Sequence, residues 1–140
     1  MNKMMNPKIS IITVVFNGEK QIKSTIESVL NQTYNNYEYI IIDGLSTDNT
    51  LKIVKTYKNI KWISEKDTGI YNAMNKGISL ANGEIIGILN CGDLYSQKCL
   101  NDVIVEYSKA KLKHDDDFVI SGGMLLVDYK NNSKTYNLSI

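Results

Sequence analysis

The sequence predicts an α/β fold in which a mainly parallel sheet carries helices on both faces. Apolar runs rich in β-branched residues alternate along the chain with segments in which apolar residues recur at helical spacing. This alternation is typical of parallel sheets built from β-α-β units. The chain has 140 residues with no linker and no internal repeat, so we expect one domain over residues 1–140.

The strands are predicted from apolar runs that end in turn residues. Ile9–Phe16 is a nearly continuous β-branched run that Asn17 and Gly18 end, so it is the first expected strand. Further strands are expected at Tyr39–Ile42, Ile60–Ser64, Glu84–Leu89 and Phe118–Ser121. Near the carboxyl terminus, a hairpin is expected from Met124–Val127 and Lys134–Tyr136, on either side of residues 130–132.

The helices are predicted from apolar residues spaced three or four positions apart. Four such stripes follow the first four strands in turn: Ile22, Ile26, Val29 and Leu30; Leu51, Val54 and Tyr57; Ile70, Met74, Ile78 and Ala81; Leu100, Ile104 and Tyr107. Ser46, Thr47 and Asp48 stand before the second stripe, and residues of these types favour the start of a helix. The expected order is therefore β-α-β-α-β-α-β-α-β, followed by the hairpin.

Composition and charge argue against several classes of protein. The formal net charge is +1, so the chain lacks the positive field of a nucleic-acid-binding protein. Every basic side chain is a lysine, so a side chain that contacts phosphate does so as a point charge. Cys91 and Cys99 form no CxxC pair, which favours a reduced, cytoplasmic setting. No apolar run approaches the ~20 residues of a membrane-spanning helix or resembles a signal peptide.

Polar residues follow several of the expected strands directly. Asn17, Asp43, Glu65–Asp67 and Asp93 each stand just past the carboxyl end of a strand. In open parallel sheets, ligands bind outside the carboxyl ends of the strands. We therefore expect these residues to converge on one rim, where they form the candidate binding site.

Asp93 lies in the stretch Leu89–Tyr95, "LNCGDLY", in which an apolar run stops at Asn, Cys, Gly and Asp. A carboxylate in this place suits a hard divalent cation, Mg²⁺ or Mn²⁺. Because Mg²⁺ takes one or two protein carboxylates and fills its shell with phosphate oxygens and water, one Asp is sufficient when a nucleotide diphosphate is bound. The alternative is a β-turn, for which Asn, Gly and Asp are all favoured, and this stretch by itself favours the turn.

Each of the other motifs also has a purely structural interpretation. Asn17 and Gly18 suit a simple turn, and Asp43 suits a turn or helix-start carboxylate. We interpret Asp48 as structural, because it stands where a cap or first-turn acid belongs. Lys76 by its spacing alone is a solvated lysine, and His114–Asp117, "HDDD", is a solvated loop rather than a metal cluster.

Taken together, the motifs resemble a known family. "ISIITVVFNGEKQIKSTIESVLNQTYNNYEYIIIDGLSTDNT" and "SEKDTGIYNAMNKGISLANGEIIGILNCGD" resemble two successive blocks of the family 2 glycosyltransferases of GT-A fold, a Rossmann-like fold. The resemblance covers about residues 8–121. It implies a nucleotide-binding set of Thr13, Val14, Asn17, Asp43, Asp67, Asn75 and Lys76. In that set Asp43 reads the base, commonly uracil. It also implies that Asp93 is the last acid of a DxD-type motif and binds Mg²⁺ or Mn²⁺ beside the donor diphosphate.

The resemblance implies an inverting transferase that moves a sugar, of hexosyl type, from a nucleotide-diphosphate donor to a hydroxyl acceptor. Its implied setting is bacterial surface polysaccharide synthesis, with a glycan or lipid-linked acceptor. It leaves open a peripheral association with the inner face of the membrane. Asn90 replaces the first acid of the motif, so it adds no charge for the metal.

The catalytic residues stay unknown at this stage. Members of the family carry the base that deprotonates the acceptor, and the acceptor-binding region, well beyond the DxD-type motif. Asp128 and Asp115–Asp117 are poorly placed for that base. We therefore expect a donor-binding part that is short on the acceptor side, and an exposed apolar face there offers a route to homo-oligomers.

Three alternatives remain open. The chain binds a nucleotide sugar and catalyses nothing; or it is another nucleotide enzyme, such as a sugar nucleotidyltransferase; or it is a scaffold that binds no nucleotide. Residues 13–20 lack the glycine-rich, basic phosphate loop expected of a nucleotidyltransferase.

Overall fold

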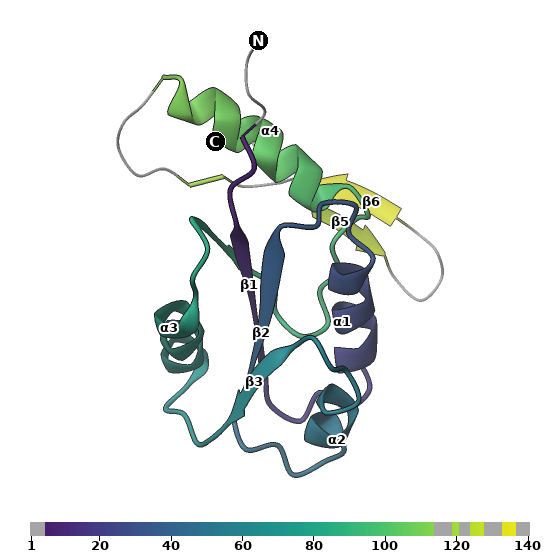
Figure 1. The fold of residues 1–140 in the computed structure, drawn as a ribbon. Helices are drawn as coiled ribbons and strands as arrows, with labels where there is room; N and C mark the ends of the chain where they lie inside the picture. Colours follow the sequence, from purple (N-terminus) through teal and green to yellow (C-terminus); the bar gives the residue numbers. More distant parts are fainter. Residues whose placement is uncertain (1–4, 114–118, 121–123, 128–132, 137–140) are drawn as a thin grey trace. The chain divides into compact units, whose positions relative to one another are not determined.

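The computed structural model describes residues 5–113, 119–120, 124–127 and 133–136 (Figure 1). The chain divides into two compact units, Met1–Ile104 and Val105–Ile140. The first unit holds a four-stranded sheet with its helices, and the second holds a two-stranded hairpin. The single domain expected over residues 1–140 stays a prediction.

The sheet of the first unit is entirely parallel, as predicted. Its strands are β1 (Ile9–Val15), β2 (Tyr37–Asp43), β3 (Lys61–Ser64) and β4 (Ile85–Ile88), in the order β3-β2-β1-β4. The register pairs Val15 with Asp43 and Asp43 with Ser64. Because the strands run the same way, their carboxyl ends lie at one edge of the sheet, which we call the carboxyl edge (Figure 1).

One face of the sheet is covered by α1 (Ile22–Leu30), α2 (Thr50–Val54) and the first turns of α4 (Cys99–Lys111) (Figure 1). The residues that α1 buries are spaced three or four apart, so they form one helix face. Ile22, Ile26 and Val29 pack there against odd-numbered residues of β1 and β2. Each buried Ile or Val side chain stabilises the fold by ~1.5–3 kcal/mol relative to its exposed state.

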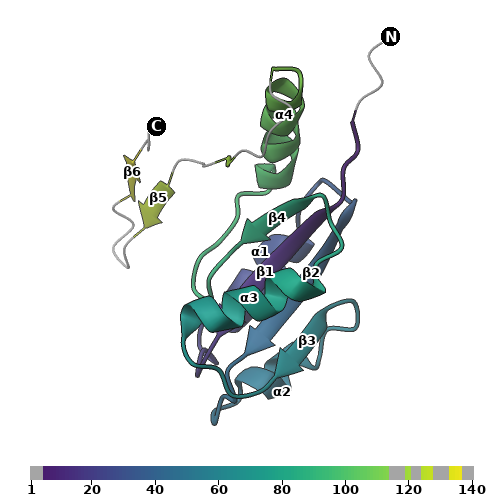
Figure 2. The ribbon, with the colours of Figure 1, turned by 90° about the vertical axis from the view of Figure 1, so that its left-hand side faces the viewer.

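The opposite face is covered by α3 (Ile70–Leu80), which lies across the strands in Figure 2. Of the predicted apolar stripe of this helix, Met74 and Ala81 pack against the core on this face, but Ile70 and Ile78 are exposed. Ala73 and Gly77 are buried there, whereas Ile70 is 49% exposed and Ile78 is 45% exposed. A Cβ atom on Gly77 would lie 2.4 Å from Cγ2 of Ile12, so only glycine allows this close approach.

An apolar surface remains open at the β4 edge of the sheet. Ile86 and Ile88 pair in register with Ser10 and Ile12, so they point to the α3 face, and they are 40% and 38% exposed. The exposed apolar face expected on the acceptor side stays a prediction. The homo-oligomer that it would favour stays a prediction.

In the second unit, β5 (Met124–Val127) and β6 (Ser133–Tyr136) form the antiparallel hairpin that the sequence predicted. Of the strand expected at Phe118–Ser121, only Val119 and Ile120 are described, and neither lies in a strand. His114–Asp117 and Asp128 lie outside the described residues.

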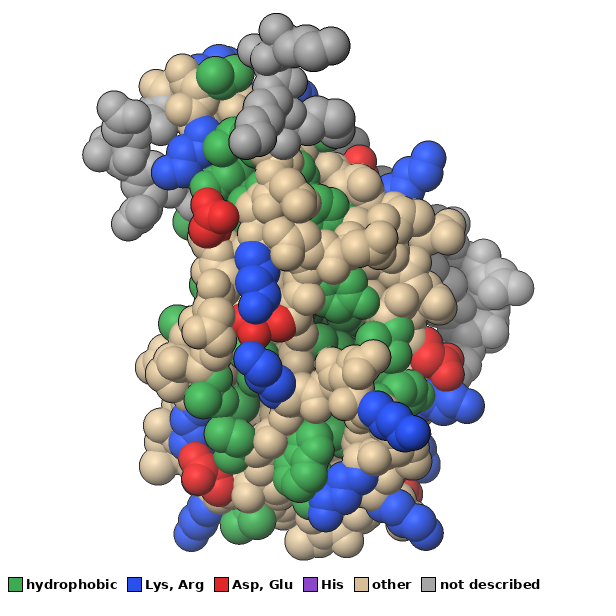
Figure 3. All heavy atoms as spheres, in the orientation of Figure 1, with side chains coloured by type: hydrophobic (Ala, Val, Ile, Leu, Met, Phe, Trp, Pro, Cys, Tyr) green, Lys and Arg blue, Asp and Glu red, His purple; other side chains and the backbone are tan. Residues whose placement is uncertain are grey.

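Two further features bear on general properties of the chain. None of the described helices is long and apolar enough to cross a membrane, and the predicted cytoplasmic location stays a prediction. On the face drawn in Figure 3, lysine and acidic side chains are interspersed without a large field of one sign. This agrees with the near-zero net charge of +1.

Candidate functional site

Asp43 is the last residue of β2 and the deepest acid at the carboxyl edge. The residue is 0% exposed. Its Oδ2 accepts hydrogen bonds from the backbone N–H of Ser46 at 3.2 Å and the hydroxyl of Ser64 at 2.6 Å, and its Oδ1 accepts one from the hydroxyl of Ser46. All three donors are uncharged, so the negative charge of Asp43 has no positive partner among them.

The turn after β1 is held against the loop after β2. Asn17 has a φ of 50°, which its side chain tolerates better than most. Its backbone N–H donates to the hydroxyl of Ser46 at 2.8 Å, and its Oδ1 accepts the N–H of Thr47 at 2.8 Å. The structure thus brings Asn17 to the predicted rim, where its side chain orders the loop that follows Asp43.

The same two segments are joined again at Asp48. Its carboxylate accepts the N–H of Thr50 at 2.9 Å and the N–H of Glu19 at 3.1 Å. Desolvation raises the pKa of Asp48, but the hydrogen bonds from Thr50 and Glu19 outweigh it, and the pKa is lowered. Asp48 therefore fixes the start of α2, which confirms its structural interpretation. We call the two joined segments, residues 17–19 and 44–50, the pinned loops.

Asp67 reaches the same region from the loop after β3. A Cβ built on Gly44 would lie 2.7 Å from Oδ2 of Asp67 and 3.6 Å from the ring of Phe16. The Asp67 carboxylate also accepts the N–H of Gly69 at 2.9 Å. Asp67, predicted from the sequence, therefore lies close to the residue that follows Asp43.

Phe16 is a residue of the rim that the sequence analysis missed. It follows β1 directly and is 64% exposed. A large aromatic side chain at the open end of a buried strand suits stacking on a flat ligand. The signal was available in the sequence, because an aromatic residue stands between a buried run and an Asn-Gly turn.

Asp93 lies in the loop that follows β4. It is exposed, and its carboxylate has no hydrogen-bond or ion-pair partner among the residues that the structure describes. Nearby, Oδ1 of Asn90 is buried and without a hydrogen-bond partner within the described part of the chain. Burial raises the pKa of the Cys91 thiol, and the negative charges of Asp48 and Asp93 raise it further, which places this loop beside the pinned loops.

Asp93 and Asn90 offer few ligands, so they fit a divalent cation such as Mg²⁺, which takes only one or two protein carboxylates. Within the described residues, no group of three or more His, Cys, Asp or Glu side chains could enclose a metal. Asp93 offers one carboxylate and Asn90 one neutral oxygen, so a diphosphate and water would have to complete the shell.

Four predicted nucleotide-binding residues remain, and they are Thr13, Val14, Asn75 and Lys76. Thr13 is buried in the core, where its hydroxyl is 2.9 Å from that of Tyr39, and Val14 is 7% exposed, so neither side chain faces a ligand. Lys76 on α3 is held by Glu65 at 2.9 Å and the carbonyl of Lys66 at 2.8 Å. Asn75 beside it is exposed. The assignment of these four residues stays a prediction.

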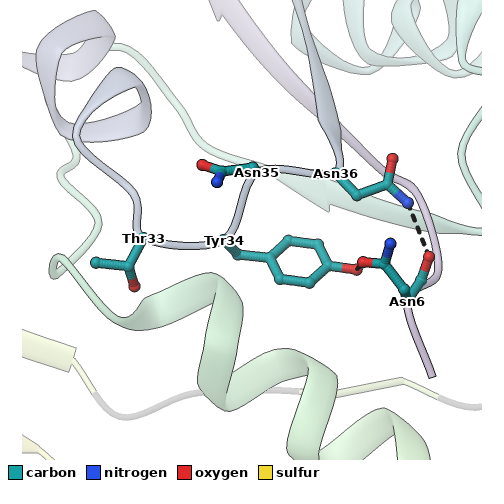
Figure 4. A pocket seen from close by; sticks show the side chains of 5 residues that line it. All are labelled: Asn6, Thr33, Tyr34, Asn35 and Asn36. Carbon is teal, nitrogen blue, oxygen red and sulfur yellow. Dashed lines mark hydrogen bonds between the residues drawn. The ribbon is translucent and has the colours of Figure 1, made fainter. Parts of the chain in front are cut away.

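A shallow hollow of about 500 Å³ lies at the other end of the sheet (Figure 4). It is lined by uncharged polar residues that precede β1 and β2: Asn6, Thr33, Tyr34, Asn35 and Asn36. The hydroxyl of Tyr34 donates to the carbonyl of Pro7, and Asn36 donates to the carbonyl of Asn6. Because these groups tie the amino ends of the strands together, the hollow is separate from the carboxyl edge.

Comparison with known proteins identifies the family. The model of "Glycosyl transferase family 2" matches residues 10–134. The chain belongs to this family. Among curated relatives, it is 37% identical over 126 residues to a dolichyl N-acetyl-α-D-glucosaminyl phosphate 3-β-D-2,3-diacetamido-2,3-dideoxy-β-D-glucuronosyltransferase of Methanococcus voltae. It is 33% identical over 124 residues to the Escherichia coli UDP-Glc:α-D-GlcNAc-diphosphoundecaprenol β-1,3-glucosyltransferase WfaP.

These alignments cover 84% and 81% of the family 2 chain but only 39% and 49% of the relatives. The chain thus spans less than half of the length of either relative. The predicted family is confirmed, and the activity of the whole protein is a separate question.

Solved structures confirm the predicted GT-A, Rossmann-like fold. S. aureus TarS 1–349, crystallised in complex with UDP-GlcNAc, matches with a TM-score of 0.70 and 26% identity, covering 74% of this chain and 32% of that one. The Pyrobaculum calidifontis mannosyltransferase PcManGT, crystallised with GDP-Man and Mn²⁺, matches with a TM-score of 0.60 and 24% identity, covering 65% and 29%. The second likeness is evidence for the fold alone.

Proposed function

We propose that this family 2 chain binds a nucleotide-diphosphate sugar, a UDP-sugar by preference, at the carboxyl edge of its sheet. The observation that carries the proposal is the arrangement of the two acids there. Asp43 is buried and held rigidly by hydroxyl and amide donors, while Asp93 is exposed and unpaired among the described residues. A nucleotide diphosphate needs both kinds of carboxylate, one for its base and one for its metal-bound phosphates.

Asp43 and Phe16 would hold the base. The buried carboxylate of Asp43 accepts hydrogen bonds only, so it selects a base that presents an N–H group, as uracil does. Phe16 supplies an exposed ring on which such a base can stack, which contributes ~1–3 kcal/mol for a base on an aromatic ring. Asp67, close to Gly44 and Phe16, lies where it can accept a further hydrogen bond.

Asp93, with Asn90 as a neutral neighbour, would hold Mg²⁺ or Mn²⁺ against the diphosphate. The bound cation would neutralise the charge that develops on the departing nucleotide diphosphate. Support comes from the carboxylate of Asp93, which is exposed and unpaired among the described residues. Because Asn90 contributes no charge, we propose that the metal binds weakly until the diphosphate is present.

The whole protein is proposed to be an inverting hexosyltransferase that passes the sugar to a hydroxyl of a glycan or lipid-linked acceptor in bacterial surface polysaccharide synthesis. The names of two relatives support a lipid-linked acceptor, since they describe dolichyl and undecaprenyl compounds. The acceptor hydroxyl requires a general base, and its identity stays open.

A second candidate is nucleotide-sugar binding without transfer. The other carboxylates that the described residues bring to this edge already have partners: Asp43, Asp48, Asp67, Glu19 and Glu65. Asp93 is left for the metal, so no described carboxylate is free to act as the base. This observation favours a chain that binds the donor and performs no transfer by itself.

The first experiment is calorimetric titration of the purified chain with UDP, with and without Mn²⁺. We expect Mn²⁺ to tighten UDP binding, and Asp93→Ala to remove that gain, a loss of about tenfold or more in affinity. Asp102→Asn on the exposed side of α4 is the matched control and should bind like the parent. Asp93→Ala should leave the free energy of unfolding within about 0.5 kcal/mol, because its side chain is exposed and unpaired among the described residues.

Equal UDP affinity of the parent and Asp93→Ala in Mn²⁺ would remove the metal from the proposal. A folded parent that binds no UDP under either condition would remove the nucleotide as well. Incubation with a UDP-sugar then separates the two candidates. Slow hydrolysis of the UDP-sugar, without transfer of the sugar to an added acceptor, supports the second candidate.

A further inference from the structure

Three polar side chains hold the segment that follows β4: two lie on one edge of helix α1, and the third lies just beyond the carboxyl end of that helix. Thr25, Ser28 and Gln32 are spaced three and four residues apart, and we call them the α1 polar edge. Thr25 is 0% exposed and Gln32 is 6% exposed, although neither is apolar. Buried polar side chains need hydrogen-bond partners, and here the partners are backbone groups of residues 92–100.

The contacts follow the segment in order. Thr25 Oγ1 accepts the N–H of Gly92 at 2.9 Å and donates to the carbonyl of Asp93 at 3.1 Å. Ser28 Oγ accepts the N–H of Tyr95 at 3.2 Å. Gln32 donates to the carbonyl of Ser96 at 2.6 Å and accepts the N–H of Leu100 at 3.0 Å. The segment is therefore fixed by side chains that lie far away in the sequence.

The single hydroxyl of Thr25 contacts both the N–H of Gly92 and the carbonyl of Asp93. Gly92 has a φ of 99°, a backbone conformation that residues with a side chain rarely adopt. A Cβ at this position would lie 3.3 Å from Cδ and Oε1 of Gln21. The Asp93 N–H also donates to the carbonyl of Asn90 at 3.0 Å. The backbone on both sides of the Asp93 Cα atom is thereby fixed, and so is the direction in which its side chain leaves.

We propose that Thr25 is a positioning residue for the Asp93 carboxylate, holding it where a divalent cation meets the donor diphosphate. The proposal rests on the function proposed for Asp93 above. Thr25 touches neither metal nor nucleotide; it acts through the backbone of Gly92 and Asp93. Because Asp93 carries the only charge that the loop offers to a metal, its direction determines the affinity of the site.

The test compares Thr25→Val, which keeps the shape and removes the hydroxyl, with Thr25→Ser, which keeps the hydroxyl. Thr56→Val is the control, because the exposed Thr56, like Thr25, donates its hydroxyl to a backbone carbonyl, in this case that of Ile53 at 2.7 Å. Two quantities are measured by NMR: the hydrogen-exchange rate of the Gly92 amide, and broadening of the Asp93 signals by Mn²⁺ alone. Calorimetry adds the Mn²⁺ dependence of UDP binding.

We expect Thr25→Val to speed exchange of the Gly92 amide and to weaken Mn²⁺ binding about tenfold, within the ~10–100-fold range of residues that orient metal ligands. UDP binding without metal should stay unchanged, since the base side of the site is untouched. Thr25→Ser should recover to within about twofold of the parent, and Thr56→Val should equal it. If Thr25→Val fails to fold, Thr25→Ala is compared with Thr25→Ser in the same way.

The outcomes separate this inference from the proposed function. Faster Gly92 exchange with unchanged Mn²⁺ affinity would show that Thr25 is only structural and would overturn the inference. Mn²⁺ binding that depends on Thr25 in a chain that binds no UDP would keep the inference and reject the nucleotide. A folded parent in which Mn²⁺ does not reach Asp93 would reject both.

Discussion

Strand β2 carries a carboxylate near each of its ends, and the groups that contact the two carboxylates differ in charge. Glu38 lies near the amino end, where its side chain is 8% exposed and contacts two lysines. Asp43 lies at the carboxyl end, 0% exposed, and its three hydrogen-bond donors are all uncharged. The charge of Glu38 is compensated by two lysines of the chain, whereas the hydrogen-bond donors around Asp43 are uncharged.

Glu38 connects several segments at the amino end of the sheet through its carboxylate. Its carboxylate accepts hydrogen bonds from Ser10 Oγ at 2.6 Å, from Lys61 Nζ at 2.8 Å and from the backbone N–H of Asn82 at 2.6 Å, and Lys8 Nζ lies 3.4 Å away. Burial alone raises the pKa of Glu38, but the hydrogen bonds and the charge of Lys61 outweigh it and lower the pKa to about 2. The amino end is thus a charge-compensated clamp.

The difference shows how the two ends of one sheet are specialised. At the amino end every donor that Glu38 needs comes from the chain, so nothing is left for a ligand to satisfy. At the carboxyl end the chain supplies orientation without compensating the charge, so a ligand with N–H groups or a cation gains by binding. Substitutions at the amino end should therefore change stability, and those at the carboxyl end should change binding.

The largest effect is expected for Glu38→Gln. The depressed pKa corresponds to about 3 kcal/mol of stabilisation, since each pKa unit is worth about 1.36 kcal/mol. Because the folded-state pKa lies below the ordinary value of 4.5, this contribution is fully present above about pH 4.5 and is lost as the pH falls towards 2. Urea unfolding measured across this range should show the loss in the parent and a flatter profile in Glu38→Gln.

Glu27→Gln is the control for Glu38→Gln. Its side chain is 50% exposed and its ion pair with Lys23 is 3.8 Å long, so stability should change by less than about 0.5 kcal/mol. UDP affinity should be the same in both variants. A marked loss of nucleotide affinity in folded Glu38→Gln would mean that the two ends are not independent.

Asp43→Asn is expected to have the next largest effect on stability, about 1–2 kcal/mol. The new amide places an N–H group among the donors of Ser46 and Ser64, so buried hydrogen bonds are lost. The same variant should lose UDP affinity about tenfold or more, with or without Mn²⁺, which distinguishes it from Asp93→Ala. Calorimetry and urea unfolding on one preparation check both effects. Unchanged UDP affinity would remove Asp43 from the proposed base site.

The smallest effect separates the two lysines at the amino end. Lys61→Met should destabilise the chain by up to about 1 kcal/mol, because its ammonium is 2.8 Å from Glu38 but 58% of its side chain is exposed. Lys8→Met should have less effect, since its distance to Glu38 is 3.4 Å. Thermal unfolding at low salt checks the order. The reverse order would mean that the hydrogen bond from Lys61 is not the main contact of Glu38.

The sequence was sufficient for most of the fold because its strongest signals are those of a buried parallel sheet. The run at Ile9–Phe16 leaves no other assignment, and β1 is buried throughout. The order of strands and helices then places Asp43 and Asp93 at one edge by topology alone. The predicted stripe of α3 was correct at Met74 and Ala81 and wrong at Ile70 and Ile78. Periodicity follows large apolar residues, whereas contact with Ile12 is made by the smallest residue, Gly77.

The parts of the site that escaped the sequence analysis are polar residues whose partners lie far along the chain. Thr25 on α1 looks like a solvent-facing helix residue, and only the fold brings Gly92 and Asp93 to it. Ser64 ends a short strand, and nothing local indicates that it donates to Asp43. Contacts of this kind depend on register between distant segments, so neither propensity nor spacing reveals them.

The pinned loops have a consequence for the thermodynamics of ligand recognition. Hydrogen bonds of Asn17, Gly18 and Glu19 to residues 46–50 are already formed without a ligand. The conformational entropy of these loops is thus lost when the chain folds, and little is left to lose when a base arrives. Recognition there should be close to rigid docking, with fast association and little change in hydrogen exchange. Any slow rearrangement on binding should instead arise in the loop after β3, where the partly exposed Lys76 is held by an ion pair with the exposed Glu65 and by the carbonyl of Lys66.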